Sequence, residues 1–163
     1  MSRGASVRTL AGLLVAVTVG ACGSLVVGQP TPTPQDFGGI VSSLADAGIT
    51  VTNVVSGDSG CSDPNLFGPA IGFDASGLGA TAPLRLHVYI FADTEAYARR
   101  RPDVDRCIAR YATDPATFET VDAAPYVLAG QGPWPASFKA GARTALARAA
   151  GSNAASPEPS VSP

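Results

Sequence analysis

The order of apolar and polar positions predicts alternating helices and strands in the middle of the chain. In residues 84–91, leucine, valine and isoleucine alternate with Arg85, His87, Tyr89 and Phe91. A period of two residues is typical of a β-strand whose two faces differ, so the aliphatic face is expected to meet a hydrophobic core. Shorter runs rich in β-branched or aromatic residues predict further strands at residues 49–55, 70–73, 118–121 and 125–129.

Helical spacing first appears just before the first of these strands. Phe37, Ile40 and Leu44 recur at intervals of three and four residues, which places them on one stripe of a helix. The helix is expected to begin near residues 33–34, where a threonine can cap and a proline suits the first helical position. Gly48 is expected to end it.

Two later segments have the same spacing. Residues 94–111 predict a helix that Pro102 interrupts, and residues 135–150 predict a final helix. The order of elements favours an α+β domain in which the helices pack on one face of a mainly antiparallel sheet. A single domain over residues 34–150 has the usual size for one hydrophobic core.

The ends of the chain have a different character. Residues 22–33 finish in alternating proline and threonine, which predicts an extended linker. Residues 151–163 lack an apolar pattern and are expected to be a disordered tail. At the start, Arg3 and Arg8 precede an uncharged apolar run. A charged start followed by a short apolar stretch is typical of a secretory signal peptide.

That apolar run ends in Val19-Gly20-Ala21-Cys22, which resembles the lipobox of bacterial lipoproteins. The resemblance implies that residues 1–21 are a cleaved signal peptide and that Cys22 carries lipid, with acyl chains such as palmitate. The implied partner is the cell membrane, with the domain on its extracytoplasmic side. An uncleaved membrane-spanning helix over residues 9–28 is the alternative, because this stretch is uncharged and about long enough to span a bilayer.

The chain has three cysteines. If Cys22 is lipidated, Cys61 and Cys107 are left, and an oxidising compartment favours a disulfide between them. Free thiols or a metal pair are the alternatives. A metal site would need carboxylates as further ligands, because the chain has a single histidine. We therefore predict a disulfide, and neither a metal nor a cofactor.

Charge narrows the choice of partners. Without the two arginines of the leader, nine bases remain against 13 acids, a formal charge of about −4. Nucleic-acid binding usually needs a basic face that neutralises phosphates, so this class of partner is excluded. An unknown protein or small molecule remains possible as ligand.

One tetrapeptide suggests catalysis. Gly57-Asp58-Ser59-Gly60 resembles the nucleophile segment of trypsin-like proteases and the Gly-Asp-Ser of GDS-type esterases. A serine nucleophile needs a histidine base oriented by a carboxylate. The sole histidine follows the serine, where the protease order puts it first, and Leu84 stands where the esterase pattern has aspartate. The alternative is a turn closed by local side-chain hydrogen bonds, and we expect a protein that is not an enzyme.

Three further residues are candidates for a ligand or partner surface, namely His87, Tyr89 and Trp134. The histidine and tyrosine share one face of a predicted strand, although such a row can also be a half-exposed surface held by cross-strand pairs. The tryptophan ring can instead pack over the first turn of the last helix.

Taken together, the sequence predicts a membrane-anchored extracytoplasmic lipoprotein that acts as a binding or structural module of the bacterial cell envelope. The alternatives are a secreted hydrolase that uses Ser59 and an inhibitor or accessory subunit of another envelope protein.

Overall fold

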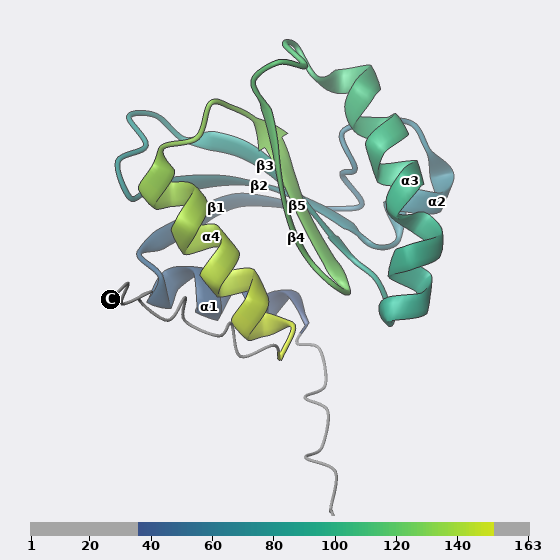
Figure 1. Ribbon diagram of the computed structural model, residues 1–163, viewed down its shortest axis with the longest axis horizontal. Coiled ribbons are helices and arrows are strands. Elements are labelled where there is room, and N and C mark those ends of the chain that lie inside the picture. The colour runs from purple at the N-terminus through teal and green to yellow at the C-terminus, as the bar shows by residue number, and fades with distance from the viewer. Residues whose placement is uncertain (1–35, 152–163) are drawn as a thin grey trace, which may run out of the picture. The chain divides into compact units, whose positions relative to one another are not determined.

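The computed structural model describes residues 36–151. Within them, one antiparallel sheet has the strand order β1-β2-β3-β5-β4 (Figure 1). The strands are β1 (Ile49–Ser56), β2 (Ala70–Gly77), β3 (Leu84–Ile90), β4 (Phe118–Ala123) and β5 (Tyr126–Gln131). The helices are α1 (Phe37–Asp46), α2 (Pro64–Phe67), α3 (Thr94–Tyr111) and α4 (Ala136–Ala149). The predicted α+β class with an antiparallel sheet is confirmed.

Helices α1 and α4 lie side by side on one face of the sheet (Figure 1). The predicted aliphatic face of β3 is buried beneath them, with Leu86 and Val88 fully enclosed. Helix α1 begins after Asp36, whose carboxylate accepts a hydrogen bond from the Gly39 N–H at 3.0 Å. This cap satisfies a backbone donor that the first helical turn leaves free. The cap predicted at residue 33 lies outside the described residues.

The opposite face is covered as well, which differs from the expectation that the helices gather on one side. Helix α3 packs across it (Figure 1), and its buried residues Val104, Cys107 and Ile108 meet Tyr89 and other apolar residues of the sheet. The second face of β3 begins with arginine and histidine and so suggests a solvated surface. Its later residues are large rings, and burying rings of that size stabilises the fold strongly.

Helix α3 also runs through Pro102, where an interruption was predicted. Proline lacks the N–H that would bond to the carbonyl of Ala98, four residues earlier. Both residues are exposed, so water can satisfy this carbonyl. An ion pair between Arg101 and Asp105 on the same helix spans the proline. Arg101 also contacts Asp122 of β4 at 2.5 Å, which ties the helix to the edge of the sheet.

Candidate functional site

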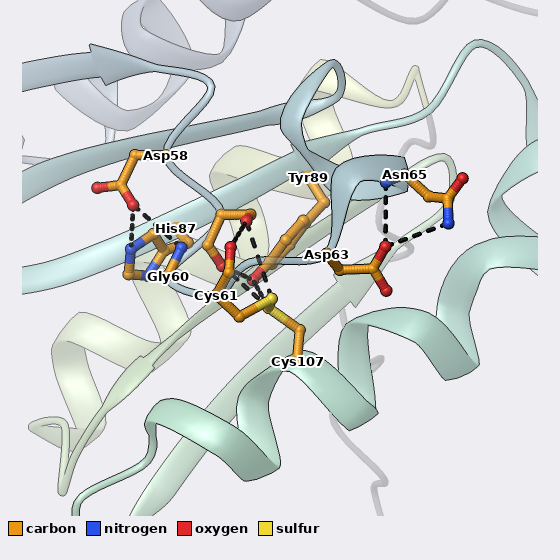
Figure 2. The surroundings of a disulfide bond; sticks show 9 residues. Asp58, Gly60, Cys61, Asp63, Asn65, His87, Tyr89 and Cys107 are labelled. Carbon is orange, nitrogen blue, oxygen red and sulfur yellow. Dashed lines mark hydrogen bonds and ion pairs between the residues drawn. A yellow bond between two sulfur atoms is a disulfide. The ribbon is translucent and has the colours of Figure 1, made fainter.

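The tetrapeptide that suggests catalysis and Cys61 both lie in the loop that joins β1 to α2, residues 57–63, which we call the Asp58 loop. The loop contacts β3 at Arg85, His87 and Tyr89 and is attached to α3 by a disulfide (Figure 2). It therefore connects an element on the second face of the sheet with the strand beneath.

Cys61 and Cys107 form the predicted disulfide, with their Cα atoms 5.6 Å apart. Cys107 comes from the buried side of α3 and Cys61 from the Asp58 loop (Figure 2). The bridge joins residues 46 positions apart in the chain. Closing a loop of this length contributes about 4 kcal/mol in the chain-entropy model. The disulfide is therefore a main connection between the loop and the helix.

Asp58 is the charged centre of the loop. Its carboxylate lies 2.5 Å from the Arg85 guanidinium and 3.4 Å from Nε2 of His87, and it accepts a hydrogen bond from the Gly60 N–H at 3.0 Å. Burial by itself would raise the pKa of Asp58. The Gly60 hydrogen bond and the positive charge of Arg85 outweigh burial, so the pKa is lowered and the carboxylate stays ionised.

A glycine of the neighbouring strand makes room for this pair. A Cβ atom on Gly72 would lie 2.3 Å from Asp58 Oδ2 and 2.7 Å from the Arg85 guanidinium. Gly72 is paired with His87 in the β2–β3 register, so it lies directly beneath the Asp58 loop. The ion pair depends on the absence of a side chain at this position.

His87 is buried, with 6% of its surface exposed, so it does not belong to the surface that we predicted from the sequence. Its ring packs against Tyr111 of α3, with ring centroids 5.1 Å apart. Burial lowers the pKa of His87 more than the nearby Asp58 raises it. The ring is therefore neutral near pH 7. Its Nδ1 atom is buried and has no hydrogen-bond partner in the described part of the chain.

Ser59 has only 1% of its surface exposed. Its hydroxyl donates a hydrogen bond to the Cys61 carbonyl at 2.7 Å, inside the loop. Its carbonyl accepts a hydrogen bond from the Tyr89 hydroxyl at 2.8 Å. These contacts are those of a closed turn, and the hydroxyl does not face solvent as a nucleophile would need to.

Tyr89 has no exposed surface, so it is also wrong as part of the predicted surface. Its ring is enclosed between the sheet and α3, and burial raises its pKa strongly. Burial likewise raises the pKa of Tyr111 to about 12. Both phenols therefore remain protonated at ordinary pH.

Trp134, with 5% of its surface exposed, is the third residue of the predicted surface that proves to be buried. Its ring meets Phe138 of α4 edge-on, at a centroid distance of 5.8 Å, and its N–H donates to the Gln131 carbonyl at 3.1 Å. The turn after β5 thus directs the ring into the core beneath α4. This is the packing role that we set beside the surface interpretation.

A polar network beside the Asp58 loop was not predicted. The Arg85 guanidinium also reaches Asp74 at 3.3 Å and the Asn53 carbonyl at 3.2 Å. The Asn53 amide donates to Asp74 at 2.7 Å, and Asn53 adopts a left-handed conformation with φ 51° at an irregularity of β1. An asparagine inside a β-branched run was the available signal, because asparagine tolerates this conformation better than most residues.

The described residues 36–151 contain no cluster of three or more histidine, cysteine, aspartate or glutamate side chains that could hold a metal ion. None of the helices among them is long and apolar enough to cross a membrane. The predicted signal peptide, the lipidation site Cys22, the linker and most of the predicted tail lie outside the described residues.

The geometry of the loop supports a structural role for its charged groups. Asp58 holds Arg85 and contacts His87, while the disulfide and the Tyr89 hydrogen bond hold the following residues.

Comparison of the chain with protein-family models, with curated proteins and with solved structures gives no match.

Proposed function

We propose that this protein is a lipid-anchored extracytoplasmic module of the bacterial envelope that acts by binding or by structural support. The lipobox-like ending Val19-Gly20-Ala21-Cys22 supports the anchor. Lipidation of Cys22 by a diacylglycerol would attach two acyl chains, and two chains give stable membrane attachment where one is marginal. The domain would then stand away from the bilayer on the proline-rich linker.

The observation that carries the proposal is the pairing of Cys61 with Cys107. The disulfide accounts for two of the three cysteines and leaves only the one that follows the signal-like segment. Disulfides persist mainly in oxidising compartments. The bridge and the export signal therefore favour the same location by independent arguments.

Catalysis has less support than binding. A hydrolase based on Ser59 would need its hydroxyl to leave the Cys61 carbonyl and reach solvent. The accessory-subunit alternative would be favoured by an exposed apolar patch around Tyr89 or Trp134, and both residues are buried. We therefore propose a non-catalytic module.

Metabolic labelling with an alkyne-tagged fatty acid tests the anchor. The full chain should incorporate the label, and Cys22→Ala should lose it completely. Cys61→Ala is the matched control, because it removes a cysteine outside the lipobox-like motif and should keep the label. Label on the Cys22→Ala variant, or an unlabelled wild-type chain, would contradict the proposal.

A further inference from the structure

The two cysteines of the disulfide differ in their access to solvent. Cys107 has 1% of its surface exposed, because α3 holds it against the sheet. Cys61 is only partly buried, and the residue that follows it, Ser62, is exposed. Cys61 reaches the bridge from the Asp58 loop and Cys107 reaches it from the helix (Figure 2). A molecule in solution therefore approaches the bridge more readily from the loop than from beneath α3.

The surroundings of Cys107 suit a free thiol as well as a disulfide. Its Sγ atom lies 3.1 Å from the Ser59 carbonyl oxygen and 3.8 Å from the Tyr89 hydroxyl. The sulfur has no hydrogen while the bridge is intact, but a thiol is a weak donor and a carbonyl oxygen has two lone pairs. A Cys107 thiol could thus donate to the Ser59 carbonyl, beside the Tyr89 hydroxyl that already does so. A reduced Cys107 would not lack a partner at this buried position.

The Asp58 loop also has contacts that do not depend on the bridge. Asp58 pairs with Arg85, and the Ser59 carbonyl accepts the hydrogen bond from Tyr89. The Ser59 hydroxyl bonds to the Cys61 carbonyl and lies 3.8 Å from Cys61 Sγ. These contacts hold Cys61 near α3 when the bridge is open, so that the two sulfurs can react with one another again.

We propose that Cys61 is a site of reversible modification by small thiols, with Cys107 as the resolving cysteine. A thiolate from solution attacks Cys61 Sγ, forming a mixed disulfide with Cys61 and breaking the Cys61–Cys107 bond. The electron pair of that bond leaves on Cys107 Sγ, which takes a proton from water and becomes a thiol. In the reverse step the Cys107 thiolate attacks Cys61 Sγ and expels the small thiol. Neither step needs an oxidant, because each exchanges one disulfide for another.

Peptide mapping after brief exposure to β-mercaptoethanol tests the site with the oxidised full chain. Excess N-ethylmaleimide stops the exchange and caps the cysteine that has been freed. The first product should carry mercaptoethanol on Cys61 and maleimide on Cys107, in about tenfold or greater excess over the opposite isomer. In concentrated urea both sulfurs are exposed, so the two isomers should form in amounts within about twofold of each other.

A variant separates attack on the folded domain from attack on the unfolded chain. Ile40→Val shortens a fully buried side chain of α1, on the other face of the sheet, and so destabilises the domain at a distance from the bridge. The rate of exchange should be unchanged in this variant. Attack that required unfolding would instead become faster by the same factor as the unfolding equilibrium constant increases.

Several outcomes would overturn the proposal. They are equal isomers from the folded chain, an excess of the isomer modified at Cys107, an excess that persists in urea, a rate that follows the unfolding equilibrium, and the absence of any mixed disulfide. Mapping reads each cysteine separately, so the result does not depend on lipid at Cys22.

Discussion

Nε2 of the buried His87 lies 3.4 Å from the carboxylate of Asp58, while Nδ1 of the same ring has no partner in the described residues. Nε2 thus faces a negative charge, whereas Nδ1 is buried without a hydrogen-bond partner among those residues. Protonation of the ring would strengthen the contact with Asp58, but it would also bury an N–H without an acceptor, and burial is the larger effect on the pKa.

The domain should therefore become less stable as the solution is acidified below about pH 6.5, the ordinary pKa of histidine. The pKa of His87 is lowered by folding, so the unfolded chain binds more protons in this range. The contribution of His87 to the free energy of unfolding is fully present above the pKa that this residue has in the unfolded chain. It is lost progressively as the pH falls from that value to the lower pKa in the folded chain. Urea unfolding between about pH 7.5 and about pH 5 measures the effect.

His87→Gln provides the control for this pH dependence. The chain has no other histidine, so the variant should have a nearly flat profile over the same range. A wild-type domain whose free energy of unfolding is constant or rises on acidification would contradict the environment described for His87.

Gly72→Ala should lower the free energy of unfolding by about 1–3 kcal/mol, because the new methyl group would overlap the Asp58–Arg85 pair. Gly68→Ala is the matched control. No atom lies within 4 Å of a Cβ at Gly68, and its φ of −59° suits alanine. Chemical unfolding measures the free energy of unfolding of both variants. Equal values would count against the close packing at Gly72.

Tyr89→Phe should cost about 1–3 kcal/mol, because it leaves the buried Ser59 carbonyl without its hydroxyl donor. Tyr97→Phe removes a hydroxyl that bonds to Asp122 at 2.9 Å, but this carboxylate keeps Arg101. The control should therefore cost about 0.5 kcal/mol or less. Thermal unfolding compares the two variants, and a larger loss for Tyr97→Phe would reverse the expected order.

Removal of the disulfide by the double change Cys61→Ala and Cys107→Ala should cost about 2–4 kcal/mol. The unfolded chain gains freedom when the bridge is lost, and the Asp58 loop keeps only its hydrogen bonds and ion pairs. Unfolding of the reduced wild-type protein should give a similar loss. A variant as stable as the oxidised protein would show that the loop is held by its other contacts.

The local pattern predicted most elements of the fold. The aliphatic residues of β3 and the stripe of α1 are buried as expected, because period and burial are linked within one element. The side of the sheet on which α3 packs was not predictable in this way. It depends on contacts between Tyr89 and residues such as Val104 that are distant in the sequence.

The candidate site shows the same limit. The disulfide could be predicted because the number of cysteines left only one pairing once Cys22 was assigned to lipid. Burial of His87 could not, because histidine has no fixed preference for core or surface, whereas packing of Trp134 on the last helix was one of the two interpretations of that residue. The contact of Arg85 with Asp58 was also missed, since it joins a strand to a loop through the space above Gly72.

The most direct test of the proposed anchor is the intact mass of the full chain extracted from membranes, recorded with and without reduction and alkylation. We expect a chain that begins at Cys22, carries a diacylglycerol on that residue, and accepts two alkyl groups only after reduction. A water-soluble chain that retains Met1, or one whose Cys22 is free to react with the alkylating reagent, would contradict the account.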